Sequence, residues 1–306
     1  MVKKEFYRRA CNGEGQVYTT AFERDNPKGI VQIVHGMSEH SGRYDDLAER
    51  LQKEGYSVYA MDLTGHGISQ QGHKGAFAME AGGFNSLVDD IESLFRFAKK
   101  RSGNCPNIII GMGMGATLAL LHCAEYGSED LLIGIGQISN PAMAGPIHTA
   151  AANHVRMYGY NSVSMAVHNM FMDHVKMPGT SPVNQYYWLS SDEREIKAYV
   201  DDPDCGFPLT SSAYKEFIEG NKALLKDIKK GRLKDIPMYL MCGSMDDLGG
   251  YSKASRDIAK LMNNNGSSQV AVKVYRNGKH DILHDFCRDE VMDDICSWIG
   301  HNIHVM

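Results

Sequence analysis

One turn of this sequence has the residue types that place a reactive side chain at the end of a strand. The strand-like segment Asn107–Ile110 runs into Gly111-Met-Gly-Met-Gly115, and a helical pattern follows to Tyr126. This order of strand, tight turn and helix is the setting of the G-x-S-x-G nucleophile elbow, in which small residues let strand and helix pack closely. The central position, where a nucleophilic hydroxyl is expected, holds Gly113. One interpretation of the pattern is therefore a nucleophile elbow whose central residue has no nucleophilic side chain.

Phosphate binding is a second interpretation of this turn, since a G-x-G-x-G run after a strand also resembles dinucleotide-binding turns. Two features oppose it. The turn follows the fifth strand-like segment instead of the first, and no acidic residue closes a strand about 20 positions later. We therefore expect no cofactor at this turn.

The elements that must position the turn alternate between strand and helix along most of the chain. The predicted strands are Lys4–Arg9, Val17–Glu23, Gly29–His35, Tyr56–Leu63, Ile108–Ile110, Leu131–Ser139, Ile236–Cys242 and Val270–Tyr275. The predicted helices are Tyr44–Leu51, Phe84–Ala98, Gly115–Tyr126, Ser252–Met262 and Glu290–Ile299. Repeated strand and helix units with nearly continuous apolar strands predict a mostly parallel sheet covered by helices on both faces.

Composition places the chain among folded globular proteins. Its 306 residues carry 32 Lys and Arg against 37 Asp and Glu, and this net charge of -5 argues against a nucleic-acid partner. The N-terminal residues form no signal peptide, and no run reaches the ~18 apolar residues of a membrane span, so we expect a cytoplasmic location. Seven scattered cysteines without a C-x-x-C pair argue against disulfides and structural zinc.

The alternation stops between about residues 141 and 210, where no clean strand pattern occurs. The first half of this insertion is rich in methionine, at positions Met143, Met157, Met165, Met170, Met172 and Met177. Because thioether side chains adapt to varied apolar shapes, the insertion could be a lid over an apolar ligand, or an irregular helical subdomain whose methionines fill gaps. We divide the chain into a core, 1–140 and 211–306, and a cap, 141–210.

Three further motifs resemble one family. His35-Gly-Met-Ser-Glu-His-Ser-Gly-Arg-Tyr44 and Asp62-Leu-Thr-Gly-His-Gly67 follow predicted strands, and Asp202-Pro-Asp-Cys-Gly-Phe-Pro208 lies in the insertion. Over nearly the whole chain, the sequence resembles the monoacylglycerol lipase and lysophospholipase (serine aminopeptidase-like) branch of the α/β-hydrolase superfamily. This resemblance implies an α/β-hydrolase fold, with an eight-stranded, mostly parallel sheet, helices on both faces and a cap inserted after the sixth strand. It also implies a Ser-Asp-His triad that hydrolyses medium or long-chain acyl esters.

The resemblance also assigns roles to individual residues. Gly243-Ser-Met-Asp246 matches the acid segment after the seventh strand, which makes Asp246 the candidate acid and Asp247 the alternative. His280 follows the eighth strand and takes the place of the catalytic histidine. The backbone N–H groups of Met37 and Met114 would form the oxyanion hole, and the nucleophile position, where Ser is expected, is Gly113. His284 lies four residues after His280, but no third ligand accompanies the pair, so we expect no metal site.

The missing hydroxyl leaves three hypotheses. In the first, the chain is a carboxylic-ester hydrolase of this type in which glycine replaces the nucleophile, so that it is inactive or nearly so on acylglycerols or similar lipid-like esters. In the second, it is a non-catalytic protein that binds or senses an acyl ligand. In the third, His280 and Asp246 act as a general-base pair without a serine. A small acyl ester or lipid-like molecule is the expected partner, and transient contact of the cap with a membrane surface stays open.

Overall fold

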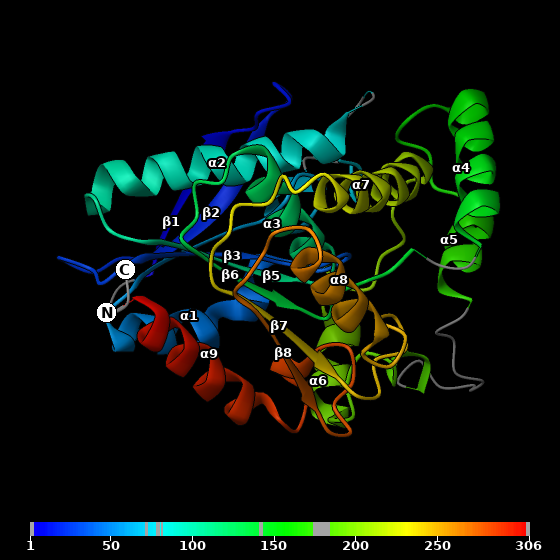
Figure 1. The fold of residues 1–306 in the computed structure, drawn as a ribbon. Coiled ribbons are helices and arrows are strands. Elements are labelled where there is room, and N and C mark those ends of the chain that lie inside the picture. The colour runs from blue at the N-terminus through cyan, green and yellow to red at the C-terminus, as the bar shows by residue number, and fades with distance from the viewer. Residues whose placement is uncertain are drawn as a thin grey trace.

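The centre of the molecule is an eight-stranded sheet in the order β1-β2-β4-β3-β5-β6-β7-β8 (Figure 1). The computed structural model describes residues 3–70, 73–77, 80, 82–140, 143–173 and 184–303. The strands are β1 (Lys4–Arg9), β2 (Gln16–Phe22), β3 (Ile30–Val34), β4 (Ser57–Met61), β5 (Asn107–Met112), β6 (Leu131–Ile135), β7 (Met238–Gly243) and β8 (Val270–Tyr275). The pairs β1–β2 and β2–β4 are antiparallel and the other pairs are parallel, which confirms the predicted sheet.

Helices cover both faces of this sheet (Figure 1). The helices α1 (Asp45–Glu54) and α9 (Arg288–Ile303) pack on one face, and α2 (Gly83–Ser102), α3 (Met114–Glu125), α7 (Ser211–Lys229) and α8 (Lys253–Asn263) pack on the other. Alternate residues of β3 enter the two cores: Val31 and Ile33 pack with α1 and α9, whereas Ile30 and Val34 pack with α2 and α3. Burial on both faces explains why the central strands are apolar at consecutive positions.

The predicted strands lie within a few residues of the observed ones, whereas helix α7 has no predicted counterpart. Its start carries a signal, because the Thr210 side chain accepts a hydrogen bond from the Ala213 N–H at 3.3 Å as an N-cap. Tyr214, Phe217 and Ile218 form its buried apolar face. Four short 3-10 helices complete the described elements: η1 (Ser41–Tyr44), η2 (Gly67–Gln70), η3 (Asn184–Tyr186) and η4 (Ile282–His284).

The insertion follows β6, as predicted, and its described residues form no strand. It contains α4 (Ala144–Tyr158), α5 (Met165–Met172) and α6 (Glu193–Asp201), with α4 packed along α7. Of its methionines, Met172 faces a pocket and Met170 packs against the core, whereas Met143, Met157 and Met165 are each more than half exposed. Met177 lies outside the described residues. The described methionines therefore line a pocket at one position and form an outer surface at three.

Within the described part of the chain, no helix combines the length and the apolar character needed to cross a bilayer.

The contact between β3 and the start of α3 depends on Gly115. A Cβ at this position would lie 2.2 Å from the carbonyl oxygen of Val34 and 2.5 Å from that of His35. Both neighbours are backbone atoms of the central sheet, so only movement of the helix could relieve the overlap. We expect Gly115→Ala to lower the free energy of unfolding by about 3 kcal/mol or more, measured as a shift of the urea midpoint.

Gly300 provides the matched control for this substitution. It lies inside α9, and no atom is within 4 Å of where its Cβ would be. Gly300→Ala should raise the free energy of unfolding by about 0.5–1 kcal/mol, because alanine is the better helix former. Equal effects of the two substitutions would show that the contact at Gly115 is less tight than the structure indicates.

Candidate active site

The loops that carry the predicted site residues meet at one edge of the sheet. Met37 follows β3, Gly113 and Met114 follow β5, Asp246 follows β7 and His280 follows β8. These strands are parallel, so their carboxyl ends share an edge, which is where α/β sheets bind their ligands. The topology thereby gathers residues that lie far apart in the sequence.

Gly113 forms the sharp turn between β5 and α3. Its φ of +55° and ψ of -112° lie in a region that costs residues with a Cβ about 1–3 kcal/mol. The Gly113 N–H donates to the Ile135 carbonyl at 2.9 Å, which ties the turn to β6. A Cβ at this position would lie 3.3 Å from His280 Nε2 and 3.5 Å from Ile138 Cδ1. A side chain at position 113 would therefore project toward the imidazole ring.

Gly243 allows the loops after β7 and β8 to approach each other. A Cβ on Gly243 would lie 2.0 Å from the Gly278 carbonyl oxygen and 2.2 Å from that of Lys279. Only glycine permits so close an approach of the chain that leads into His280. The glycine of the G-x-x-D segment therefore positions the histidine loop, and the aspartate three residues later meets that histidine.

His280 and Asp246 form a buried hydrogen-bonded pair. His280 Nδ1 lies 3.0 Å from Asp246 Oδ1, and the same oxygen accepts the Gly249 N–H at 2.9 Å. Asp246 is fully buried and His280 is 5% exposed. Burial alone would lower the pKa of His280, but the charge of Asp246 and its hydrogen bond raise that pKa above the usual value of histidine. Since an ionised carboxylate only accepts, Nδ1 carries a proton and Nε2 faces Gly113.

The structure distinguishes the two candidate acids. Asp246 contacts His280, whereas the neighbouring Asp247 is partly exposed and hydrogen-bonds the Tyr251 side chain, whose pKa it raises. Asp246 is therefore the carboxylate that the fold brings to the histidine.

The insertion contributes to the placement of His280. The backbone N–H groups of His280 and Asp281 donate to the carbonyls of Trp188 and Leu189, at 3.2 and 2.8 Å. The Trp188 ring lies against the imidazole, with ring centres 5.7 Å apart. Sequence patterns gave no signal for this contact, because it joins two irregular segments through main-chain atoms.

The turn that contains Met37 is held by His35 and Glu39. The Leu63 N–H donates to His35 Nε2 at 2.9 Å, so in the neutral ring Nδ1 carries the proton and donates to the Gly36 carbonyl at 2.8 Å. Burial lowers the pKa of His35 and keeps the ring neutral. Glu39 accepts the Gly36 N–H and the Tyr44 hydroxyl. Gly36 Cα would be 3.9 Å from a Cβ at position 113, so the Gly36–Met37 turn lies beside the elbow.

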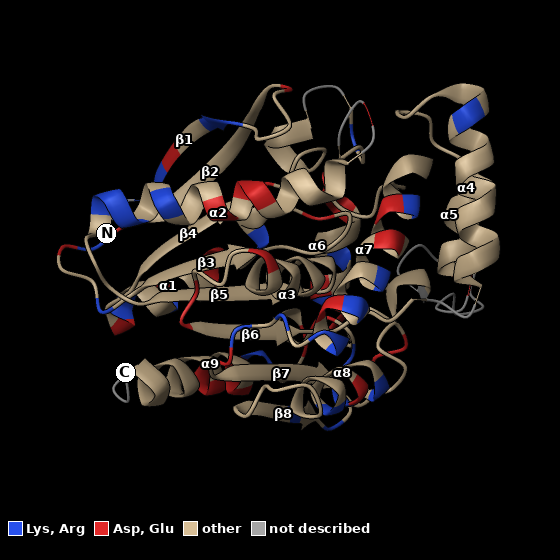
Figure 2. Ribbon diagram, turned by 45° about the horizontal axis from the view of Figure 1, so that its top comes forward, with Lys and Arg blue, Asp and Glu red and all other residues tan. Residues whose placement is uncertain are grey.

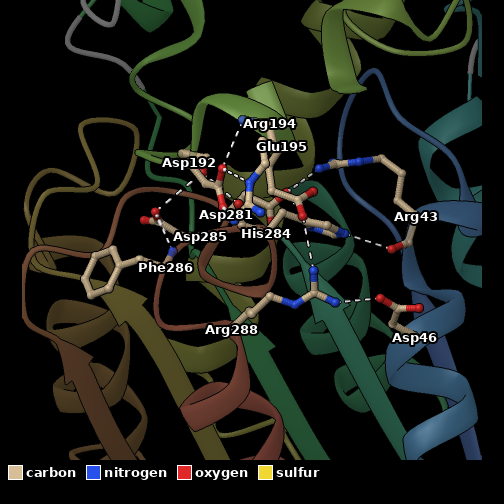
Figure 3. A network of polar contacts seen from close by, with 11 residues as sticks. Arg43, Asp46, Asp192, Arg194, Glu195, Asp281, His284, Asp285, Phe286 and Arg288 are labelled. Carbon is tan, nitrogen blue, oxygen red and sulfur yellow. Dashed lines mark hydrogen bonds and ion pairs between the residues drawn. The ribbon is translucent and has the colours of Figure 1, made fainter. Parts of the chain in front are cut away.

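An ionic network joins this turn to the histidine loop, and Figure 3 shows the part of it formed by Arg43, Asp281 and His284. Arg43 pairs with Glu39 and, at 2.8 Å, with Asp281, the residue after His280. His284 contacts Asp281 through Nδ1 at 2.9 Å and the Arg43 carbonyl through Nε2 at 2.8 Å. Burial would raise the pKa of Asp281, but His284 and Arg43 hold it well below its usual value. Glu39 and Arg43 belong to the His35–Tyr44 motif, but the sequence analysis predicted no role for either residue.

The same network extends to the insertion and to α1 (Figure 3). Arg288, at the start of α9, pairs with Asp46 of α1 and, at 3.1 Å, with Glu195 of α6. The insertion is thus anchored to the core beside the site by ion pairs as well as by main-chain hydrogen bonds.

Among the described residues, one group could place three ligand atoms on a metal ion: His40, Asp202 and Cys205, with ligand atoms within 4.8 Å of one another. The Gly42 N–H donates to His40 Nδ1 at 3.2 Å, so Nε2 carries the proton and donates to Asp202 at 2.9 Å. This geometry is that of a hydrogen-bonded pair, and it joins the Asp202–Pro208 motif to the His35–Tyr44 motif.

A pocket opens in front of His280 and is walled by both the core and the insertion. The core supplies Met37, Met112, Ile138, Leu248 and His280, and the insertion supplies Phe171, Met172, Tyr186, Trp188, Leu189 and Phe207. Most of these side chains are apolar, which fits an acyl chain. Ser38 also lines the pocket and donates its hydroxyl to the Phe207 carbonyl at 2.7 Å.

Comparison with known families agrees with this geometry. The family model described as serine aminopeptidase, S33, matches residues 25–286. The chain belongs to this family. It is 25% identical over 288 residues to the monoacylglycerol lipase of Mycolicibacterium smegmatis, covering 92% of each chain. It is 26% identical over 302 residues to the monoglyceride lipase of Mus musculus, covering 95% of this chain and 89% of the relative.

Solved structures show the same fold. A thermostable carboxyl esterase from Bacillus coagulans, in complex with glycerol, superposes with a TM-score of 0.89 at 24% identity, with 99% of each chain covered. This family member is thus a monoacylglycerol lipase-like protein on an α/β-hydrolase fold, with Gly113 at the elbow between β5 and α3.

Proposed function

We propose that this family member is a carboxylic-ester hydrolase of the monoacylglycerol lipase type whose nucleophile position is Gly113 and which is therefore inactive or nearly inactive on acylglycerols. One observation carries the proposal. A Cβ at position 113 would lie 3.3 Å from His280 Nε2, while His280 Nδ1 is hydrogen-bonded to Asp246. In this proposal Asp246 is the acid and His280 the base, and the group that would stand between the base and the substrate is missing.

The chemistry of the complete site follows from this geometry. With a hydroxyl at position 113, His280 Nε2 would take its proton while the oxygen bonds to the ester carbonyl carbon. The N–H groups of Met37 and Met114 would stabilise the resulting oxyanion. Collapse would break the ester bond, and His280 would give its proton to the departing alcohol; water would then repeat the sequence and release the acid. Glycine has no oxygen to form the first bond. Restoring a hydroxyl at position 113 tests the proposal.

The mostly apolar pocket supports a second candidate function, the binding of an acyl ligand without turnover. This function requires the pocket and not a nucleophile, and both core and insertion residues line that pocket. We propose on the same grounds that residues 141–210 act as a cap over the ligand. Tight acyl binding combined with an inert Gly113→Ser variant would favour this candidate over a disabled hydrolase.

The third hypothesis is a general-base enzyme that uses His280 and Asp246 without a nucleophile, and it predicts a different result. The unchanged chain must catalyse a measurable reaction, and His280→Gln must abolish it. A reaction that survives this substitution would exclude His280 as the base.

The outer face of the insertion supports transient contact with a membrane surface. Helix α4 carries one charged residue, Arg156, and α5 carries none (Figure 2). The large side chains Met143, Met157, Tyr158 and Met165 are each more than half exposed. A weakly charged surface with exposed apolar side chains can enter the interface of a lipid layer.

The pH dependence of a restored enzyme follows from His280, which must be neutral to accept a proton. Asp246 raises the pKa of His280 above the usual value of histidine, so the ring stays protonated, and unable to act as a base, to a higher pH than an isolated imidazole. We expect kcat/KM of Gly113→Ser to rise with pH along a single limb whose midpoint lies above 6.5. A midpoint well below that value, measured with p-nitrophenyl butyrate, would contradict the charge of Asp246 as the dominant influence.

A further inference from the structure

The carboxylate of Asp285 joins the loop that carries His280 to the insertion. Asp285 is 1% exposed, and its Oδ1 accepts the Ser191 N–H at 2.9 Å and the Ser191 hydroxyl. Oδ1 also accepts the Phe286 N–H at 2.9 Å, a contact drawn in Figure 3. Oδ2 accepts the N–H of Lys279, the residue directly before His280, at 2.8 Å. One buried carboxylate therefore holds both the insertion and the main chain that leads into the imidazole ring.

The insertion contacts this loop at each of the four residues from Trp188 to Ser191. The first two do so through the main-chain hydrogen bonds described above, which end on His280 and the residue after it. Ser190 donates its hydroxyl to the His284 carbonyl at 2.6 Å. The fourth residue is bound by the buried carboxylate itself. The insertion and the histidine loop are thus joined along a continuous stretch, at whose end the carboxylate lies.

We propose that Asp285 is a positioning residue for His280. It holds the Lys279 amide and keeps the insertion against the same loop, so that the ring stays aligned between Asp246 and position 113. The inference rests on the proposed function in taking His280 as the base. It goes beyond that function in assigning the alignment of the ring to a contact between the histidine loop and the insertion.

The alignment of His280 leaves little room for movement of its main chain. Nδ1 lies 3.0 Å from Asp246, and Nε2 lies 3.3 Å from where a Cβ of residue 113 would be. Both distances depend on the direction of a ring whose main chain follows Lys279. A displacement of about 1 Å at a reacting group can lower a rate ~10²-fold. A carboxylate that fixes the Lys279 amide therefore acts on both contacts of the ring at once.

Asp285 differs in its contacts from Asp281, the other buried aspartate of this loop. Asp281 pairs with Arg43 and His284. Among the described residues no cation pairs with Asp285, and its hydrogen bonds come from main-chain N–H groups and serine hydroxyls. A carboxylate buried without a cation depends on such bonds, and each of them fixes a direction. Asp285 is therefore suited to hold the main chain in place instead of balancing a charge.

Replacement of Asp285 should act on His280 through geometry. Burial lowers the pKa of His280, and the charges that raise this pKa belong to Asp246, Asp281 and Glu39. Asparagine has the shape of aspartate, but it offers one acceptor oxygen and an NH₂ group that would face an N–H donor. Asp285→Asn therefore leaves a main-chain amide without an acceptor on one side of the residue, and the chain must shift to satisfy it.

NMR spectroscopy of the unchanged chain, with isotope-labelled histidine, tests the inference without hydrolysis. The His280 Nδ1 proton should give a slowly exchanging downfield resonance, assigned by its loss in Asp246→Asn. We expect Asp285→Asn to broaden or remove this resonance while near-UV circular dichroism is retained. Asp289→Asn is the matched control, because it removes an equal charge from an exposed residue in the first turn of α9. It should leave the resonance unchanged.

The kinetic measurement uses the Gly113→Ser background. Asp285→Asn should lower kcat about tenfold or more and change KM by less than about threefold, because the pocket is retained and the base is displaced. Asp289→Asn should change neither. Ser191→Ala removes one hydroxyl bond to the carboxylate and keeps the amide, and it should broaden the resonance and lower kcat about two- to tenfold. Ser191→Thr keeps the hydroxyl and should preserve both.

A resonance or a kcat that Asp285→Asn leaves unchanged, even with a lower urea midpoint, would show that this carboxylate only stabilises the fold and would overturn the inference. Absence of the resonance from the unchanged chain would overturn it as well. If Asp285→Asn does not fold, an unchanged resonance in Ser191→Ala decides against the inference. An inert Gly113→Ser variant would contradict only the hydrolase proposal, because the resonance reports the alignment of the ring in either case.

Discussion

Gly113→Ser should hydrolyse p-nitrophenyl butyrate and a monoacylglycerol about 10³-fold faster than the unchanged chain, or more. The reason is geometric. The new Cβ would lie 3.3 Å from His280 Nε2, so its hydroxyl can reach the ring, which is already oriented by Asp246. Steady-state kinetics on both substrates, with an active-site titration of the acyl-enzyme burst, measures the gain and identifies the covalent step.

Gly113→Ala is the matched control for this gain. Alanine and serine meet the same backbone strain at φ +55°, and both should lower the free energy of unfolding by about 1–3 kcal/mol. Only serine supplies an oxygen, so only serine should restore hydrolysis. If the alanine variant gained activity as well, the effect would come from a change in backbone shape, and the proposed role of position 113 would be wrong.

Asp246→Asn, introduced into the Gly113→Ser variant, should lower kcat by about 10⁴-fold. The asparagine amide would favour the tautomer with its proton on Nε2, which cannot accept the hydroxyl proton. It would also remove the buried charge that stabilises the imidazolium formed during catalysis. Because asparagine has the same shape as aspartate, we expect the fold to be retained, which near-UV circular dichroism would check.

Asp247→Asn in the same background is the control, since it removes an equal charge one residue away. Asp247 is partly exposed and faces Tyr251 instead of His280. We expect kcat to change by no more than about threefold, as for an exposed charge screened by solvent. Similar losses in the two variants would mean that the site responds to the total charge of this loop and not to the contact between Asp246 and His280.

The local patterns were readable because each depends on a short stretch of chain. Apolar runs marked the strands, since burial on both faces of the sheet leaves no polar positions in β3 or β5 beyond Gln32 and Asn107. Closely spaced glycines marked the elbow. They are needed because a Cβ at Gly111 or Gly115 would overlap backbone atoms of neighbouring segments. Helix α7 was not predicted from the sequence, although its Thr210 N-cap and its apolar face are both present there. The sequence also did not predict which residues of the insertion line the pocket, because the irregular segments around Trp188 and Phe207 have no periodicity.

The sequence by itself determined the order of the strands and of five helices of the core, the glycine at the elbow and the short list of residues able to do acid-base chemistry. The resemblance made Asp246 the candidate acid and Asp247 the alternative. The tertiary structure adds the contact itself, because the close approach at Gly243 brings the histidine loop to the loop that carries Asp246, whereas Asp247 is partly exposed. The tertiary structure alone showed that Arg43 forms ion pairs with both Glu39 and Asp281. These two pairs connect the Met37 turn to the histidine loop. The pairing of Arg43 with Asp281 joins residues 238 positions apart, and side-chain types and spacing do not encode the distance between such segments.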